Sequence, residues 1–330
     1  MDDDVTTGRG PLFSDPDPDR ARAFFRSKRV ALSEKVMSVD QAVSTFVHDG
    51  DYLASGGFGT NRIATALLHE VLRQEKRGLS FAGHTTTHDF EILCAGHVRG
   101  PLLARVDAAY IVGLEARGLS PQARRVMQSG DVEVCEWSNY ALAVRLRAAA
   151  TGVPFLPMRS TQGTDTFRFS ASKTVECPFT GRPLAAVPAL YPDVAFIHVH
   201  TCDPLGNARV EGISVADADL ARASKRVILT TEKIVSVDQT RESPQQTLIP
   251  SACVDAVCEV PYGSYPGNMP GCYFSDEVHL REWLAVERDP NELTAFVDRL
   301  IYETDSFQDY LEASGATHRL AELEAIEKGG

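Results

Sequence analysis

Short apolar runs and amphipathic stretches alternate along the first half of the chain. The apolar runs have the length of buried strands and lie at residues 52–55, 79–83, 108–113, 131–137 and 154–158. The stretches between them have the pattern of helices and lie at residues 63–77, 88–96, 121–130 and 139–150. Strands that alternate with helices of about ten to fifteen residues are typical of βαβ units. The pattern therefore predicts an α/β fold built on a parallel sheet.

This alternation stops at residues 160–187, which are polar and contain Pro178, Gly181 and Pro183. We interpret the segment as a long functional loop or an insertion, because long irregular segments within a domain are uncommon. The pattern then resumes with strands at 193–200, 226–231 and 254–260 and with a helix at 215–225. Two further helices, 275–287 and 290–313, are predicted to close the fold.

The first 34 residues differ from the rest, since they are charged and interrupted by prolines. We expect residues 1–34 to form an extension that packs on the outside of the fold or stays loose. The folded part is predicted to begin near Ser38. Ser38 and Gln41 have the spacing of a capping box, which favours the start of a short helix there.

Composition excludes some classes of function. The 330 residues carry a formal net charge of −12, which argues against nucleic acid as the main partner. No run of about 18 apolar residues occurs, so no membrane span is expected. The acidic start MDDDV does not resemble a secretory signal. The seven cysteines include no C-x-x-C pair and suit reduced, buried thiols, so we expect a soluble cytoplasmic protein.

The turn SGGFGTNR, residues 55–62, has the strand–glycine–helix form of a phosphate-binding loop, but it does not match the known fingerprints. Arg62 stands where a dinucleotide-binding turn has its third glycine, and the second strand ends in Gly83 and His84 rather than an acid. No G-K-[ST] sequence follows, which excludes a P-loop. The glycines still allow a ligand to approach the backbone, and Asn61 and Arg62 add donors for a carboxylate, phosphate or thioester oxygen. A purely structural turn explains the same pattern equally well.

No other motif supplies a complete catalytic or metal site. His84 and His88 are four residues apart, but the three threonines between them are poor helix formers and no third ligand is near. His198 and His200 alternate within a strand and are interpreted as hydrogen-bonded histidines near the sheet end, so no metal is expected. Glu211 precedes a glycine and is the carboxylate that most resembles a nucleophile.

Several segments together resemble the A (alpha) subunit of class I CoA-transferases, close to glutaconate CoA-transferase. The likeness covers residues 35–315 in order, and the last residues, 316–330, are interpreted as a tail. The segments that carry it are KVMSVDQAVSTFVHDGDYLASGGFGTNR, ATGVPFLPMRSTQGTD, YPDVAFIHVHTCDPLGNARVEG, DADLARASKRVILTTEKIVS and IPSACVDAVCEVPYGSYP. The resemblance implies an open three-layer α/β/α sandwich with a mainly parallel sheet.

The resemblance also implies a reaction. Members of the family move CoA from an acyl-CoA to a free carboxylate through a glutamyl-CoA thioester, and a small acid, for example a dicarboxylic one, is the expected acceptor. In two-chain members the glutamate lies in the B (beta) subunit, in an S-E-N-G-like segment that this chain lacks. No catalytic residue is therefore assigned here. A B subunit is the expected partner, in a hetero-tetramer or hetero-octamer, and a CoA thioester is the substrate, with no tightly bound cofactor.

The implied role of this chain is to position the substrate and CoA and to stabilise an oxyanion. Four loops are expected to do so. Their candidate residues are Gly56, Gly57, Phe58, Gly59, Asn61, Arg62, His84, Thr85, Ser160, Gln162, Gly163, His200, Gly206 and Asn207.

Two other reactions remain open on the same scaffold. Relatives that hydrolyse ring-containing CoA thioesters use an A-subunit glutamate whose position matches Asn139 here, with Glu136 close by. Other relatives decarboxylate glutaconyl-type CoA esters. A ligand sensor without catalysis is less favoured, because the sequence has no helix-turn-helix and no basic patch.

Overall fold

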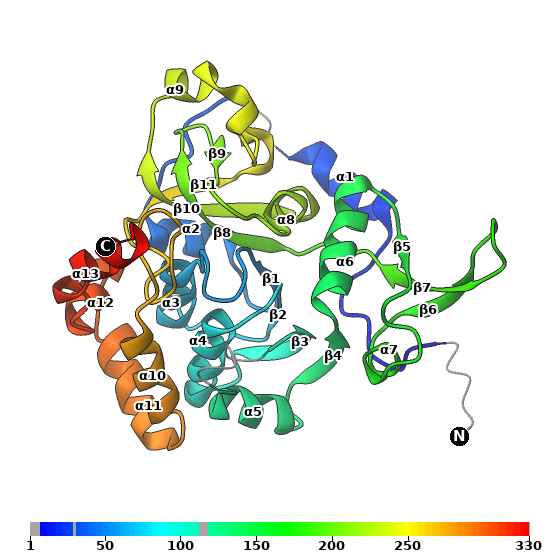
Figure 1. Ribbon diagram of the computed structural model, residues 1–330, viewed down its shortest axis with the longest axis horizontal. Coiled ribbons are helices and arrows are strands. Elements are labelled where there is room, and N and C mark those ends of the chain that lie inside the picture. The colour runs from blue at the N-terminus through cyan, green and yellow to red at the C-terminus, as the bar shows by residue number, and fades with distance from the viewer. Residues whose placement is uncertain (1–6, 29–30, 112–117, 330) are drawn as a thin grey trace.

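The computed structural model describes residues 7–28, 31–111 and 118–329 of the chain. Its centre is an eight-stranded sheet in the order β11-β10-β8-β1-β2-β3-β4, with β9 beside β8 (Figure 1). The strands are β1 (Tyr52–Ser55), β2 (Leu79–Gly83), β3 (Leu103–Ala109), β4 (Glu133–Trp137), β8 (Val194–Cys202), β9 (Ala208–Arg209), β10 (Arg226–Ile234) and β11 (Ala256–Glu259). All neighbours are parallel except β8 and β9.

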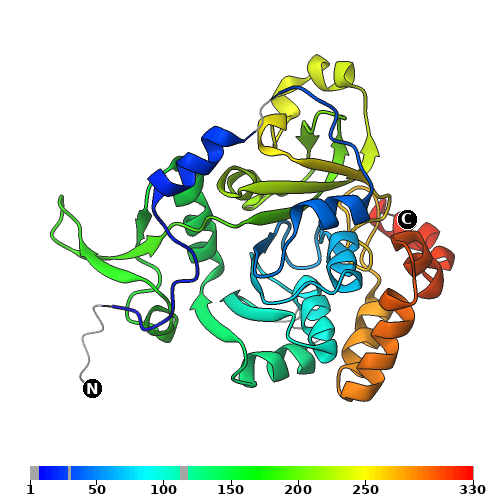
Figure 2. The ribbon, with the colours of Figure 1, turned by 180° about the vertical axis from the view of Figure 1, so that it is seen from behind.

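Helices cover both faces of this sheet and bury one apolar core on each side. The first face packs against α2 (Val39–Phe46), α3 (Thr65–Arg73), α4 (His88–Gly96), α5 (Pro121–Gln128), α10 (Glu277–Val286), α11 (Pro290–Val297) and α12 (Phe307–Ala313). The other face packs against α1 (Pro18–Ser27), α6 (Asn139–Thr151) and α8 (Asp217–Ala223), and Figure 2 shows α1 alongside α6. The predicted three-layer sandwich with a mainly parallel sheet is therefore confirmed.

The order of the strands reverses at β1. The chain runs from β1 outward through β2, β3 and β4, and then returns to place β8, β10 and β11 on the other side of β1. The helices that come after β1 and after β8 also lie on opposite faces of the sheet, α3 on one face and α8 on the other. The crevice between the carboxyl ends of β1 and β8 is thus the topological switch point, where open α/β sheets bind ligands.

The segment at residues 160–187 is folded, so its interpretation as a long loop is wrong, whereas an insertion describes it well. It contains α7 (Asp165–Phe169), β6 (Lys173–Glu176) and β7 (Pro183–Pro188), and β7 pairs antiparallel with both β6 and β5 (Phe155–Met158). The two prolines and the glycine that suggested a loop lie in or beside the turn of the β6–β7 hairpin, which extends away from the body (Figure 1).

Other element boundaries differ from the prediction for clear reasons. Strand β3 begins at Leu103 rather than at 108, because the charged side chains of Arg105 and Asp107 conceal its first half, while positions 112–113 of the predicted strand lie outside the described residues. The predicted helix at 290–313 is divided by the π-helical turn η4 (Asp298–Tyr302). The remaining short elements are η1 (His97–Arg99), α9 (Val237–Glu242), η2 (Pro244–Gln246), η3 (Ser251–Cys253), η5 (Ala316–His318) and α13 (Leu320–Glu327).

Both ends of the described part of the chain contact the body. The amides of Gly8, Arg9 and Gly10 donate to carbonyl groups of residues 168–172, next to β6. Lys28, just after α1, forms a 2.8 Å ion pair with Asp255 beside β11. At the other end, α13 packs on the loop at residues 261–274, where the Tyr262 hydroxyl donates to Glu324. Among the described residues, no helix is long and apolar enough to cross a membrane.

Candidate functional site

The glycine turn leaves β1 at the switch point, and its amide groups are already used within the chain. Gly56 N donates to the Phe196 carbonyl (2.8 Å) and Phe58 N to the Asn61 carbonyl (3.1 Å). Gly59 N donates to the Thr85 carbonyl at 2.7 Å, and Gly57 N donates to the Asp217 carboxylate at 2.8 Å. In this conformation the turn therefore does not offer the N–H groups of residues 56–59 to a ligand.

The turn instead surrounds the carboxylate of Asp217, the first residue of α8. A Cβ atom at position 56 would lie only 2.6 Å from Asp217 Oδ1. The close approach of this side chain therefore requires glycine at position 56. Gly57 has a φ of +74°, a conformation that suits glycine. The glycine-rich turn thus accommodates an anionic group, but the group is the protein's own aspartate.

Arg62 is the counter-charge of Asp217. Its Nη2 atom donates to Asp217 Oδ2 at 2.9 Å and to the Ile213 carbonyl at 3.0 Å, and both side chains of the pair are buried. Arg62 Nε and Nη1 have no hydrogen-bond partner among the described residues. Arg62 lies just before α3 and Asp217 begins α8, so the pair joins the elements on the two faces of the sheet at its carboxyl edge.

The loop after β2 lies on the other side of the glycine turn. Gly59 receives a hydrogen bond from Thr87 Oγ1 at 2.6 Å, in addition to the one its amide gives to Thr85. Thr85 Oγ1 lies 3.1 Å from His84 Nδ1 and accepts from Asn139 Nδ2 at 2.8 Å. Residues predicted from three separate segments of the sequence therefore meet at this point.

A cavity opens between these elements. Its volume is about 10 Å³, room for about one water molecule, and it is lined by Ala54, Ser55, Gly56, Gly57, Ala82, Gly83, His84, Leu142, Leu146, Leu190, Ala216, Asp217 and Leu220. The polar residues lie at the carboxyl edge, whereas Leu142, Leu146 and Leu220 come from α6 and α8 and Leu190 from the segment after β7. Burial lowers the pKa of His84, against a smaller opposing effect of the Asp217 charge, which favours a neutral imidazole here.

His200 lies on β8 beyond the end of β1, under the loop at residues 261–274. Its Nδ1 atom accepts from the Glu211 amide at 3.0 Å, so Nε2 carries the proton that it shares with the Pro270 carbonyl at 2.8 Å. Burial lowers the pKa of His200, and the nearby charge of Arg62 adds to the effect. His200 is thus a neutral residue behind Arg62, with both ring nitrogens in use.

The other candidate residues lie apart from this site. Gly206 and Asn207 belong to a turn closed by the buried Asp203, whose Oδ1 accepts from the Asn207 amide at 2.9 Å. Asn207 also lines a separate cavity of about 250 Å³ with Arg241. Ser160, Gln162 and Gly163 lie in the turn between β5 and α7, and Glu136 is exposed on β4 at one edge of the main sheet.

The loop at residues 261–274 holds the far side of the glycine turn. The Asn268 amide donates to the Thr60 carbonyl at 2.9 Å, and the Arg62 amide donates to the Asn268 carbonyl at 2.9 Å. The Asn268 side chain adds a 2.7 Å bond to Asn61 Oδ1. Asn61 is therefore engaged with a structural partner, and the turn is held from both sides.

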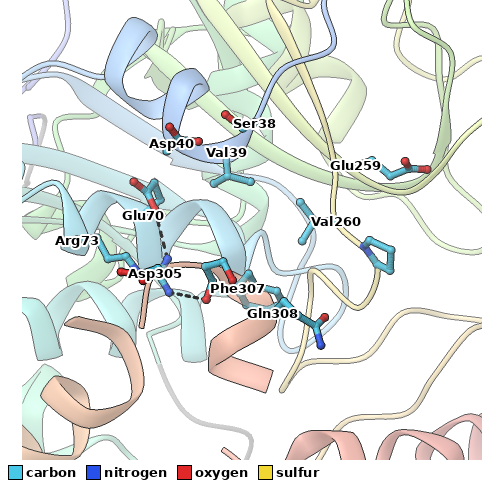
Figure 3. A pocket seen from close by; sticks show the side chains of 12 residues that line it. Ser38, Val39, Asp40, Glu70, Arg73, Glu259, Val260, Asp305, Phe307 and Gln308 are labelled. Carbon is cyan, nitrogen blue, oxygen red and sulfur yellow. Dashed lines mark hydrogen bonds and ion pairs between the residues drawn. The ribbon is translucent and has the colours of Figure 1, made fainter. Parts of the chain in front are cut away.

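A further cavity, of about 330 Å³, lies between α2, α3 and α12 (Figure 3). Arg73 is the cationic residue in its lining. The Arg73 guanidinium donates hydrogen bonds to Glu70, to Thr304 and to the carbonyls of residues 301, 304 and 306. The other ionisable side chains of its lining are acidic, namely Asp40, Glu259 and Asp305. An acidic cavity is poorly suited to an anionic ligand, so the switch point is the better candidate site.

Asp217 is the residue that sequence reasoning missed. It follows Arg62 by 155 positions, and an acid in the first turn of a helix is common for reasons of helix stability alone. The strand–turn–helix pattern located the turn, but only the fold shows which side chain enters it.

Comparison with known proteins assigns the family. Residues 36–260 match the family described as Coenzyme A transferase. The chain is 31% identical to the A chain of the glutaconate CoA-transferase of Acidaminococcus fermentans, over 88% of this chain and 95% of that one. The crystal structure of glutaconate coenzyme A-transferase from the same organism superposes with a TM-score of 0.82, at 30% identity and over 88% of this chain and 95% of that chain. The chain belongs to the CoA-transferase family, which confirms the predicted enzyme class.

Two other relatives mark the range of this scaffold. The structure of the decarboxylase AibA/AibB matches with a TM-score of 0.70 and 33% identity, over 81% of this chain and 100% of that chain. The cholesterol ring-cleaving hydrolase IpdA subunit of Rhodococcus jostii is 29% identical over 90% of this chain and 100% of its own length. The alternatives to a transferase that the sequence left open therefore have relatives on the same fold.

Proposed function

We propose that this chain is the A (alpha) component of a two-subunit CoA-transferase, which moves CoA between an acyl-CoA and a small carboxylic acid, for example a dicarboxylic one. The state of Asp217 carries the proposal. A carboxylate nucleophile must be free to attack a thioester, whereas Asp217, the carboxylate in the cavity, is buried between Gly57 and Arg62. The nucleophile then comes from a partner, as the likeness to the A subunits of known CoA-transferases supports.

In the proposed reaction, a glutamate side chain of the B subunit, acting as the nucleophile, attacks the thioester carbonyl carbon, the carbon–sulfur bond breaks, and CoA leaves as a thiolate. The thiolate then attacks the glutamyl carbonyl of the resulting anhydride, which releases the acyl carboxylate and leaves a glutamyl-CoA thioester. The acceptor acid repeats these steps in reverse. This chain would bind the CoA thioester and place donors at the developing oxyanion, with no tightly bound cofactor.

His84, Thr85 and Asn139 are the residues we propose to contact the reacting thioester, since His84 lines the cavity and Thr85 lies within hydrogen-bond distance of both His84 and Asn139. The residues of the glycine turn would shape that mouth. The loops at Ser160–Gly163 and at Gly206–Asn207 would reach only distal parts of the ligand or of the partner.

Exposed apolar side chains around the carboxyl edge support a subunit interface. Tyr110 follows β3, Tyr140 lies in the first turn of α6, and Ile213 precedes α8, and the three side chains are 44%, 62% and 68% exposed. Exposed large apolar side chains at one edge of a molecule are typical of an interaction surface. We propose that a B subunit covers this edge, in a hetero-tetramer or hetero-octamer. The seven free cysteines suit a reducing, cytoplasmic location.

The direct test is to purify the chain in complex with a B-type partner and measure CoA exchange between acyl-CoA and free acids. When it is added after acyl-CoA, hydroxylamine should convert the glutamyl-CoA thioester of the B subunit to a hydroxamate, and borohydride should reduce it to an alcohol, with release of CoA in both cases. The variant Glu211→Gln, at the exposed carboxylate that most resembles a nucleophile, should keep full activity. Full activity of this chain alone, or trapping at Glu211, would contradict the proposal.

Hydrolysis is a second candidate, because Asn139 does reach the site through its hydrogen bond to Thr85. An amide cannot act as a general base, so the native residue favours transfer. If the complex releases free CoA from acyl-CoA without an acceptor acid, and neither reagent modifies a glutamate, hydrolysis replaces transfer as the function.

A further inference from the structure

The two oxygens of the Asp217 carboxylate hold two different parts of the glycine turn. Oδ1 accepts the Gly57 amide at 2.8 Å, and Oδ2 accepts Arg62 Nη2 at 2.9 Å. We propose that Asp217 is the positioning residue of the candidate site: it sets the conformation of the turn and, through the turn, the position of His84 and Thr85. The inference rests on the proposed function and names a residue to which that function gives no role.

Burial makes this contact specific. The Asp217 side chain is 1% exposed and the Arg62 side chain is fully buried. Removing one member of a buried ion pair leaves an uncompensated charge, so the position of each side chain depends strongly on the other. Arg62 Nε and Nη1 lack a partner among the described residues, which makes Asp217 the carboxylate that holds this guanidinium there.

The contact continues to the residues at the cavity mouth. Gly57 and Gly59 belong to the same turn, and Gly59 is bonded in both directions to the loop after β2, through the Thr85 carbonyl and Thr87 Oγ1. Thr85 has a φ of +53°, an unusual conformation for a threonine, and therefore needs support from its neighbours. A shift of the turn would displace Thr85 and, with it, the contacts to His84 and Asn139.

Asp217 also determines which hydrogen-bond donors are available to the ligand. While its carboxylate holds the Gly57 amide, that amide is not available to an oxyanion. The donors for the thioester oxygen must then come from the loop after β2 and from Asn139. Asp217 lines the cavity, but its side chain is 1% exposed and its two oxygens are held by Gly57 and Arg62, so it acts through these groups.

The test uses this chain in complex with its B-type partner and compares three variants. Asp217→Asn keeps the size of the side chain and an acceptor for Gly57 but removes the charge that neutralises Arg62. Asp217→Ala removes both contacts. Asp219→Asn is the matched control, because Asp219 lies on the same helix and pairs with Arg147, whose side chain is 65% exposed.

We expect Asp217→Asn to lower kcat per folded complex by about tenfold and Asp217→Ala by about a hundredfold, since small misplacements of reacting groups have effects of this size. The KM for acyl-CoA should change by less than about threefold, because the lost alignment matters in the transition state. Asp219→Asn should match the native chain in both constants.

Amide hydrogen exchange supplies a readout that needs no activity. Exchange at Gly57 should become much faster in Asp217→Ala, while in Asp217→Asn it should stay closer to that of the native chain. If Asp217→Ala lowers only the melting temperature, and the folded complex keeps native kcat and native protection of Gly57, the inference is wrong. If Asp217→Ala does not fold, native kcat in Asp217→Asn has the same consequence. A native complex that transfers no CoA refutes the proposed function instead, and the exchange result still decides whether Asp217 holds the turn.

Discussion

Two buried arginine–aspartate pairs occupy different regions of the molecule and are built differently. In the pair between the sheet and α6, Arg145 Nη1 lies 2.8 Å from Asp107, and both side chains are fully buried. Trp137 Nε1 donates to Asp107 at 2.6 Å, and the Tyr52 hydroxyl donates to the same carboxylate. The Arg145 guanidinium also stacks on the Trp137 ring, 4.2 Å from its centre. Aromatic side chains from β1 and β4 therefore surround this pair.

The pair at the switch point has no such support from the side chains that the structure describes. Apart from each other, Asp217 and Arg62 contact backbone groups, the Gly57 amide and the Ile213 carbonyl. The Arg145 pair thus joins packed side chains of the core, whereas the Arg62 pair holds a turn. The comparison shows that the same ionic chemistry can serve the fold in one place and the shape of a site in another.

The Arg145 pair also shows how burial and charge balance. Burial alone would lower the pKa of Arg145, but the charge of Asp107, with Tyr52 beside it, raises the pKa above its ordinary value. The Arg145 guanidinium therefore remains charged in the core, and the stability of the fold depends on the Asp107 carboxylate that balances this charge.

The largest expected effect is therefore the loss of Asp107. Asp107→Ala leaves Arg145 charged and unpaired in the core, and we expect the free energy of unfolding to fall by about 3–5 kcal/mol. Urea denaturation measures this change. The control is Glu133→Ala, which removes an exposed ion pair with Arg105 on neighbouring strands and should cost less than about 1 kcal/mol. Equal effects of the two variants would show that the buried pair adds nothing to the fold.

A second prediction concerns buried polar residues that are held without charge. His69 and His279 lie between α3, α10 and α12, and burial lowers the pKa of His279 to about 3 and that of His69 well below its ordinary value. A pKa that is lower in the folded than in the unfolded chain gives stability that is present above pH 6.5 and is lost as the pH falls toward about 3.

Urea midpoints measured between neutral pH and pH 4.5 should fall in the native chain and fall less steeply in His279→Gln, which cannot take up a proton. Acid unfolding should therefore begin at these histidines. An unchanged slope in His279→Gln would mean that other groups start it.

The third prediction removes one support of the core pair without removing charge. Trp137→Phe keeps a ring beside Arg145 but loses the donor to Asp107, and we expect a loss of about 1–2 kcal/mol of stability. The kcat of the complex should stay native, since Trp137 holds the fold rather than the turn. A large loss of kcat at native stability would remove the distinction between the two pairs.

The fold could be predicted from the sequence because it rests on local pattern. The alternation of apolar runs and helices indicated the parallel sheet, and α4 was predicted with its observed ends. The pattern failed where charge lies inside a strand, as at Asp107 in β3, and where turn residues belong to a hairpin, as at Pro178 and Gly181. In both places tertiary contacts outweigh local preference.

The site was harder to predict, because proximity across the chain leaves no local signal. The sequence indicated a special turn at Gly56–Arg62, and the structure adds that Asp217, far along the chain, lies inside it. Arg62 was expected to offer charge to a ligand, whereas the structure places it fully buried against Asp217. Glycine content alone does not distinguish a turn built around a ligand from one built around a side chain.

The smallest expected effect tests whether Asp217 or the loop at residues 261–274 is the main support of the turn. Asn268→Ala removes a 2.7 Å bond to Asn61 and a 3.3 Å bond from Thr60 Oγ1, but it keeps both backbone bonds between the loop and the turn. We expect a loss of about 1 kcal/mol of stability, as for one exchanged hydrogen bond, and a fall in kcat of less than about threefold. Parallel assays of Asn268→Ala and Asp217→Asn compare the two supports directly. Because the backbone bonds remain in place, a larger fall of kcat in Asn268→Ala than in Asp217→Asn would mean that the turn is held mainly by its Asn61 contact, and that the buried ion pair is secondary at the site.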